Sequence, residues 1–171
     1  MKNVLGILFL FLLLSCTMNT GERIMSFSKD GSYPAKSIVF PNELEKDLSA
    51  QFGHSQYMLV LYFDSVHCIP CALERVKLLY NYQTDFDEMN TKIVMIVENS
   101  NEDFINDIRT KFKYPVLMDK GSFREANVVI YSLGYTAFVV DKNKNAVWLG
   151  SPIESEESWN RYKRIIKTNR N

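Results

Sequence analysis

Two runs of consecutive apolar residues do most to limit the folds that this chain can adopt. Residues 58–63 read Met-Leu-Val-Leu-Tyr-Phe, and residues 93–97 read Ile-Val-Met-Ile-Val. Such runs are too short for a buried helix and are typical of strands that are covered on both faces. A sheet built from these strands therefore needs a layer of helices on each side.

Segments with a helical spacing of apolar residues separate these runs. We expect helices over residues 42–52, 71–83, 100–111 and 122–127, and from about residue 155. Asn42 followed by Glu45 has the capping-box pattern, and Gly53 is placed to end that first helix. Alternation of apolar strands with helices predicts that neighbouring strands are parallel.

Shorter apolar segments add further strands. Residues 38–40 and 116–118 are short strand candidates, and residues 136–140 and 146–149 flank a polar turn over residues 141–145. A polar turn between two apolar segments is suited to an antiparallel hairpin. The predicted fold class is therefore α/β, with a mixed central sheet and helices on both faces.

The start of the chain has the pattern of an export signal. Lys2 precedes an almost uninterrupted apolar run over residues 4–14, which Ser15 and Cys16 follow. A basic start, a short apolar core and a small residue before the cut are typical of secretory signals. Residues 13–16, Leu-Leu-Ser-Cys, also resemble the lipobox of bacterial lipoproteins, which implies that Cys16 is acylated. An ordinary signal peptide with an incidental cysteine is the alternative.

This signal predicts the organisation and location of the protein. We expect a signal peptide over residues 1–15, a tether over residues 16–35 and one domain over residues 36–171. A lipid on Cys16 would anchor the protein in the bacterial cell envelope, facing the periplasm. Twenty basic and twenty acidic residues give a formal net charge of zero, which argues against nucleic acid as a partner.

The other two cysteines, Cys68 and Cys71, follow the first apolar run as Cys-Ile-Pro-Cys. An exported protein enters a compartment in which such a pair can form a disulfide. The free backbone N–H groups at a helix start favour a thiolate, and Pro70 suits the first helical turn. Cys68 is therefore predicted to attack, and Cys71, one turn further in, to resolve the mixed disulfide.

The dithiol and its surroundings resemble the thioredoxin-like superfamily. The likeness runs from about Ile38 to Ile166 and includes residues 114–119, Tyr-Pro-Val-Leu-Met-Asp, and the hairpin that begins near Phe138. The closest branch is that of membrane-tethered, extracytoplasmic thiol-disulfide oxidoreductases, including those that serve cytochrome c maturation. The resemblance implies a thioredoxin-like fold, protein dithiol or disulfide partners, and no cofactor besides the redox-active disulfide. It also implies that Cys68 is the nucleophile and Cys71 the resolving thiol.

Three further residues enter the predicted site through the resemblance. Tyr135 stands where the family has a cis-proline before the hairpin strand, so Tyr135 and Thr136 are expected to face the substrate. A cis bond without proline costs about 2.5–4 kcal/mol, so a trans bond and an altered loop are expected at Tyr135. His67 stands where the family often has an aromatic residue. A cationic His67 would lower the pKa of Cys68, or its ring only packs against the site.

Glu98 ends the second apolar run, where the resembling tethered reductases can carry an acidic residue near the cysteines. A desolvated carboxylate there could exchange protons with Cys71. The alternative is that Glu98 and the two residues after it form a loop entry or a helix cap, where acids and amides are favoured.

Three classes of function fit these features. The leading hypothesis is a lipid-anchored thiol-disulfide oxidoreductase, whose direction depends on the relative stability of dithiol and disulfide. The second is a soft-metal carrier in which Cys68, Cys71 and His67 bind Cu(I), or Zn(II) with an outside ligand. Tyr135 favours this class, because in the resembling family the proline keeps metals away from the dithiol. The third is a non-catalytic binding module, with partners docking on residues 134–137.

Overall fold

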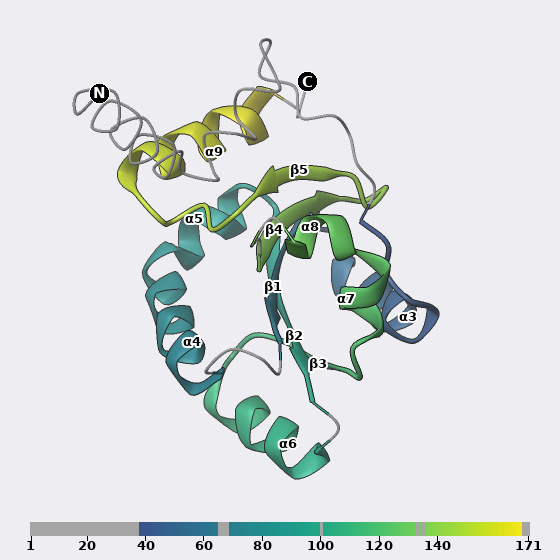
Figure 1. The fold of residues 1–171 in the computed structure, drawn as a ribbon. Helices are drawn as coiled ribbons and strands as arrows, with labels where there is room; N and C mark the ends of the chain where they lie inside the picture. Colours follow the sequence, from purple (N-terminus) through teal and green to yellow (C-terminus); the bar gives the residue numbers. More distant parts are fainter. Residues whose placement is uncertain (1–37, 65–68, 100, 133, 135, 169–171) are drawn as a thin grey trace, which may run out of the picture. The chain divides into compact units, whose positions relative to one another are not determined.

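A computed structural model of the 171-residue chain describes residues 38–64, 69–99, 101–132, 134 and 136–168. Its strands are β1 (Tyr57–Phe63), β2 (Thr91–Glu98), β3 (Val116–Asp119), β4 (Ala137–Asp141) and β5 (Ala146–Leu149). They form one sheet in the order β3-β2-β1-β4-β5 (Figure 1). The β1–β2 and β2–β3 pairs are parallel, whereas β1–β4 and β4–β5 are antiparallel. The predicted mixed sheet is confirmed, with β1 at its centre.

Helical segments cover the sheet on both sides, as predicted for strands with continuous apolar runs (Figure 1). These segments are α3 (Asn42–Phe52), α4 (Ile69–Val76), the 3-10 helix η1 (Lys77–Tyr82), α5 (Gln83–Glu88), α6 (Glu102–Lys111), α7 (Ser122–Ala126), α8 (Val128–Ser132) and α9 (Glu156–Thr168). The first face of the sheet carries α4, η1, α5, α6 and α9. The second face carries residues 38–40, α3, α7 and α8.

Alternate residues of β1 point to the two faces, although all of them are buried. Leu59 and Leu61 pack on the first face, whereas Met58, Val60 and Tyr62 pack on the second. A strand covered on both sides needs no polar alternation, which explains why the apolar run predicted its position closely.

Aromatic side chains fill much of the first face. The rings of Phe86 and Trp159 lie 5.2 Å apart, and those of Trp148 and Tyr162 lie 6.1 Å apart. The Tyr162 hydroxyl lies 2.9 Å from Thr91 Oγ1, so these two hydroxyl groups are hydrogen bonded. Trp159, Tyr162 and Ile166 of α9 are buried, as the sequence predicts for this helix.

The strand predicted over residues 38–40 is wrong. Ile38 N–H donates to the carbonyl of Lys144 at 2.8 Å, and Val39 N–H donates to Asn127 Oδ1 at 3.0 Å. The Asn127 side chain also donates to the carbonyl of Val39 at 2.7 Å. A loop carbonyl and a side-chain amide thus replace the neighbouring strand that the apolar pattern suggested.

Two predicted helices also differ in detail. The segment expected as one helix over residues 71–83 consists of α4, η1 and α5, and Pro41 occupies the N-cap position of α3 that was assigned to Asn42. The capping box is therefore absent from α3. In η1, three residues per turn place Leu79 and Tyr82 on the same side, where both pack against the first face. Within the described ranges, no helix is long and apolar enough to cross a membrane.

Candidate functional site

The Cys-Ile-Pro-Cys motif follows β1 in the sequence, and its last three residues form the start of α4. Strand β1 ends at Phe63 and α4 begins at Ile69, so the backbone of Cys71 lies in the first helical turn, as predicted. Leu73 and Val76 of the same helix pack on the first face. The predicted site residues Cys68, His67 and Tyr135, the acylation site Cys16 and the side chain of Cys71 lie outside the described residues.

Thr136 lies next to the strand that leads into the dithiol. Its carbonyl accepts a hydrogen bond from Tyr62 N–H at 2.7 Å, and the residue itself is exposed. On the other side of Tyr135, Gly134 N–H donates to the carbonyl of Tyr131 at 2.9 Å. Backbone hydrogen bonds therefore hold this loop to β1 on one side and to the end of α8 on the other.

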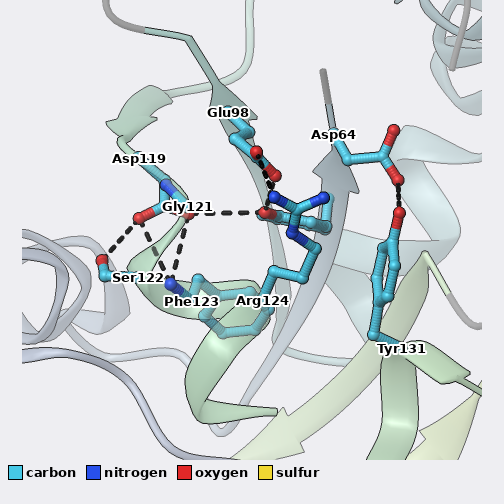
Figure 2. A network of polar contacts seen from close by, with 9 residues as sticks. Asp64, Glu98, Asp119, Gly121, Ser122, Phe123, Arg124 and Tyr131 are labelled. Atoms are coloured by element: carbon cyan, nitrogen blue, oxygen red, sulfur yellow. Dashed lines mark hydrogen bonds and ion pairs between the residues drawn. The ribbon is translucent and has the colours of Figure 1, made fainter. Parts of the chain in front are cut away.

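Glu98 is buried at the end of β2 and has partners on two sides (Figure 2). Its Oε2 atom accepts a hydrogen bond from the Tyr62 hydroxyl at 2.6 Å. Its Oε1 atom lies 2.9 Å from Arg124 Nη2. The cap of α6 comes instead from Asn101, whose side chain accepts from the N–H groups of Asp103 and Phe104 at 3.0 and 3.2 Å.

Asp119 ends β3 and is buried among donors at the start of α7 (Figure 2). Its carboxylate accepts from Ser122 Oγ at 2.7 Å, from Gly121 N–H at 3.1 Å and from Phe123 N–H at 3.2 Å. The Tyr62 hydroxyl also lies 3.4 Å from Asp119 Oδ2. Because a hydroxyl has one proton to donate, the shorter contact gives that proton to Glu98 rather than to Asp119.

A third buried carboxylate, Asp64, follows β1 directly, and the Tyr131 hydroxyl of α8 donates to its Oδ2 atom (Figure 2). The guanidinium carbon of Arg124 lies 5.7 Å from the centre of the Tyr131 ring, within cation–π range. We call Asp64, Glu98 and Asp119 the carboxylate cluster. Its members lie at the carboxyl ends of three neighbouring strands: Glu98 and Asp119 are the last residues of β2 and β3, and Asp64 directly follows β1.

Burial and contacts with the carboxylate cluster raise the pKa values of Tyr62 and Tyr131. Burial raises the pKa of Tyr62 far above its usual value, and the hydrogen bond and charge of Glu98 raise it further. The hydrogen bond to Asp64 raises the pKa of Tyr131, and the charge of Glu98 raises the pKa of Arg124. Both tyrosines are therefore neutral hydrogen-bond donors near pH 7, and Arg124 is a fixed cation.

This arrangement can hold charge and supply hydrogen bonds at the carboxyl end of β1, the strand that precedes the dithiol motif in the chain. In the part of the chain that the structure describes, no group of three or more His, Cys, Asp or Glu side chains is placed to bind a metal ion. The cluster lies on the second face of the sheet with Tyr62, whereas the helix that carries Cys71 packs on the first face. The carboxylate cluster and the helix that carries Cys71 could therefore interact only beyond the carboxyl end of β1.

The order of residues along the chain indicates the carboxylate cluster, although only Glu98 of its three members was predicted as a site residue. Asp64 follows the first apolar run, Glu98 ends the second and Asp119 follows the third. Parallel strands end at the same edge of a sheet, so acids after three parallel strands are expected to meet there. Arg124 and Tyr131 come from five-residue helices, whose position depends on packing rather than on a local pattern.

Helical spacing identifies one more carboxylate near the dithiol. Glu74 lies three residues after Cys71 on α4, and residues at this spacing are neighbours on one side of a helix. Its side chain is exposed and is paired with Lys77 at 2.8 Å. Glu74 is therefore exposed to solvent, whereas Glu98 is buried.

Comparison with known proteins supports the fold. No family model matches the chain, and no curated protein matches it. A Chlorobium tepidum structure assigned as the thiol:disulfide interchange protein DsbE is similar at 15% identity and a TM-score of 0.50, covering 70% of this chain and 84% of that one. A thioredoxin-like protein from Bacteroides vulgatus is similar at 14% identity and a TM-score of 0.49, covering 68% and 76%. The DsbE likeness and the mixed sheet with helices on both faces show that the chain has a thioredoxin-like fold.

Proposed function

We propose that the protein is a lipid-anchored, extracytoplasmic thiol-disulfide oxidoreductase that uses the Cys68 and Cys71 dithiol. The observation that carries this proposal is the place of the motif, between the central strand β1 and the first turn of α4 in a thioredoxin-like fold. N–H groups at the start of a helix stabilise negative charge, which favours the reactive thiolate. The pair itself carries the electrons, so the reaction needs no further cofactor.

The proposed reaction exchanges one disulfide for another. The Cys68 thiolate attacks a sulfur of the partner's disulfide, so that a mixed disulfide forms as the partner's S–S bond breaks, and the departing sulfur takes a proton. Cys71 then loses its proton and attacks the Cys68 sulfur, which releases the partner as a dithiol. Two electrons have passed to the partner protein, and a dithiol donor must reduce the pair before the next cycle. The reverse sequence oxidises a partner.

The other predicted site residues receive roles within this reaction. Glu98 would exchange the proton of Cys71, and its burial at the end of β2 supports a carboxylate shielded from bulk water. Tyr135 and Thr136 would face the partner polypeptide, and the exposure of Thr136 beside β1 supports this role. His67 would lower the pKa of the Cys68 thiol as a neighbouring cation.

Reversible oxidation of the purified protein tests the activity. We expect the wild-type protein to catalyse reduction of insulin disulfides by a dithiol donor, Cys68→Ser to be inactive, and Cys71→Ser to accumulate a mixed disulfide with its partner. Cys16→Ser is the matched control, because it removes the remaining cysteine without touching the pair. A pair that cannot be oxidised, or a Cys71 that is alkylated faster than Cys68, would contradict the proposal.

The anchor is tested separately. Protein isolated from its native host should have Cys16 as its first residue and carry the mass of an attached lipid, whereas Cys16→Ala should leave the membrane fraction. A mature chain that begins elsewhere, or a Cys16→Ala protein that stays in the membrane, would exclude the lipid anchor in the bacterial cell envelope.

Copper binding is the second candidate, because Tyr135 replaces a proline that in the resembling family keeps metals away from the dithiol. Under the oxidoreductase proposal, Tyr135→Pro should raise disulfide reduction and lower Cu(I) affinity. Tight Cu(I) binding by the reduced wild-type protein without any disulfide turnover would favour a carrier that uses Cys68, Cys71 and His67. The absence of both activities would favour a binding module.

A further inference from the structure

We propose that Arg124 is a positioning residue for dithiol exchange, which acts by holding Glu98 and Tyr131 in place. The inference rests on the proposed function and assigns Arg124 no contact with a reacting sulfur. Arg124 is a partner of the carboxylate cluster that neither the apolar pattern nor the dithiol motif indicated.

Arg124 closes a ring of contacts that begins at Tyr62 of β1 and returns to Asp64, directly after that strand (Figure 2). Within the ring, the Tyr62 hydroxyl donates to Glu98, and Glu98 is ion-paired with Arg124. Arg124 lies over the Tyr131 ring, and the Tyr131 hydroxyl donates to Asp64, two residues after Tyr62. Helices α7 and α8 are thereby fastened to the ends of two neighbouring strands through one guanidinium group.

The positive charge of the Arg124 guanidinium stabilises the ring, because it is paired with the buried carboxylate of Glu98. The three carboxylates of the cluster are all buried, and Arg124 brings a positive charge into contact with one of them, Glu98. Its side chain is 33% exposed, whereas that of Glu98 is 9% exposed, so the ion pair is shielded from water mainly on the Glu98 side. Loss of the guanidinium would leave Glu98 buried with its hydrogen-bond donors but without this cation, and such a carboxylate is expected to move or to take up a proton.

The ring adjoins both chain segments that the proposed reaction uses. Asp64 is the last described residue before the segment that leads to Cys68. The backbone carbonyl of Tyr131 accepts a hydrogen bond from the N–H of Gly134, the residue just before Tyr135. A shift of Tyr131 would therefore disturb the entry to the dithiol motif and the loop before β4 together. Small displacements of reacting groups lower reaction rates strongly, which gives a residue outside the reaction a measurable effect.

The test measures single-turnover oxidation of the reduced protein by a peptide disulfide at pH 7, with Arg124→Met, Arg124→Lys and the matched control Arg109→Met. Arg109 pairs with Glu102 at 2.9 Å on α6, an ion pair of the same kind that is exposed to water. We expect Arg124→Met to lower the rate about tenfold, Arg124→Lys to recover most of that loss, and Arg109→Met to stay within about twofold of wild type.

A double-mutant cycle separates positioning from a general loss of structure. In a Glu98→Gln and Tyr131→Phe background the two groups that Arg124 holds are altered, so Arg124→Met should lower the rate by no more than about twofold there. An equal loss in both backgrounds, or an unchanged rate in Arg124→Met, would overturn the inference. If Arg124→Met alone does not fold, Arg124→Lys and the triple variant decide between these outcomes. A wild-type pair that does not cycle would overturn the proposed function itself, and that failure is visible before any variant is made.

Discussion

The two faces of the sheet differ in the kind of buried polar group that they contain and in whether each group has a partner. On the first face, the Tyr114 hydroxyl and Trp148 Nε1 are buried without a hydrogen-bond partner among the described residues. On the second face, three buried carboxylates each accept hydrogen bonds from a described side chain or backbone group. A buried polar group without a partner costs about 1–3 kcal/mol, and a buried charge costs more.

The difference shows where the fold keeps charge. The first face serves mainly for packing and tolerates two neutral polar atoms without partners, since they sit on large rings whose apolar area stabilises the fold. The second face provides at least one hydrogen-bond donor for each carboxylate, at the carboxyl ends of β1, β2 and β3.

Among the substitutions considered, removal of the Asp119 carboxylate on the second face should lower the free energy of unfolding most. Asp119→Ala leaves the Ser122 hydroxyl and the N–H groups of Gly121 and Phe123 without their acceptor, so we expect the free energy of unfolding to fall by about 2–4 kcal/mol. Urea denaturation measures the loss. Asp107→Ala on α6 is the control, because its exposed ion pair with Lys111 should contribute less than about 1 kcal/mol. Equal losses in the two variants would refute the idea that the donors require Asp119.

Tyr62→Phe should have the next largest effect. The variant keeps the ring but takes the hydroxyl donor from Glu98, so we expect a loss of about 1–3 kcal/mol in the free energy of unfolding. Adding Glu98→Gln removes the buried charge and should make the loss from Tyr62→Phe smaller. Two losses that simply add would show that the hydroxyl does not act through Glu98.

Alkaline pH should weaken both faces, because the pKa values of Tyr62 and Tyr114 are raised mainly by burial. Below about pH 10 these tyrosines are protonated in both the folded and the unfolded chain, so they do not make the free energy of unfolding depend on pH. Above that pH the unfolded chain loses protons that the folded chain retains, and stability falls by up to about 1.4 kcal/mol per pH unit for each tyrosine. Urea denaturation from pH 9 to 11 should show a shallower fall in Tyr62→Phe than in wild type. An unchanged slope would mean that Tyr62 ionises normally.

Tyr114→Phe should have the smallest effect and complete the comparison. Its hydroxyl has no described partner, so its removal breaks no hydrogen bond, and we expect a change within about 1 kcal/mol, in the stabilising direction. Thermal unfolding of Tyr114→Phe beside Tyr62→Phe measures the contrast directly. A loss as large as that of Tyr62→Phe would show that the first face also depends on a hydroxyl contact.

The elements that the sequence predicted well are those with an uninterrupted local pattern. The apolar runs of β1 and β2 and the apolar face of α9 identified these elements to within a few residues, because burial on both faces or on one helical face leaves a direct trace. Residues 38–40 had the same apolar character, but their hydrogen bonds come from Lys144 and Asn127, far along the chain. Local pattern cannot reveal such partners.

Of the candidate site, local pattern located the backbone of Cys71 in the first turn of α4 and Glu98 at the end of β2, whereas the chemical roles of these residues stay predictions. The spacing of the cysteines and the acid at the end of the second run pointed to Cys71 and Glu98. Tyr62 stands inside an apolar run, and this pattern predicts only that its ring is buried. It does not indicate that the Tyr62 hydroxyl donates a hydrogen bond to Glu98. Arg124 reaches the cluster only because α7 packs against the second face, which no periodicity of a five-residue helix could indicate.

The change from parallel to antiparallel pairing at β1 also affects the order of folding. Val60 lies opposite Val94 on one side and opposite Phe138 on the other, so the parallel half of the sheet joins segments much closer along the chain. Closing a shorter loop costs less entropy, and β4 is therefore expected to join β1 late in folding. The carbonyl of Thr136 would then accept its hydrogen bond from Tyr62 N–H only after the parallel half of the sheet has formed, so the loop before β4 would be the last part of this region to be fixed in place.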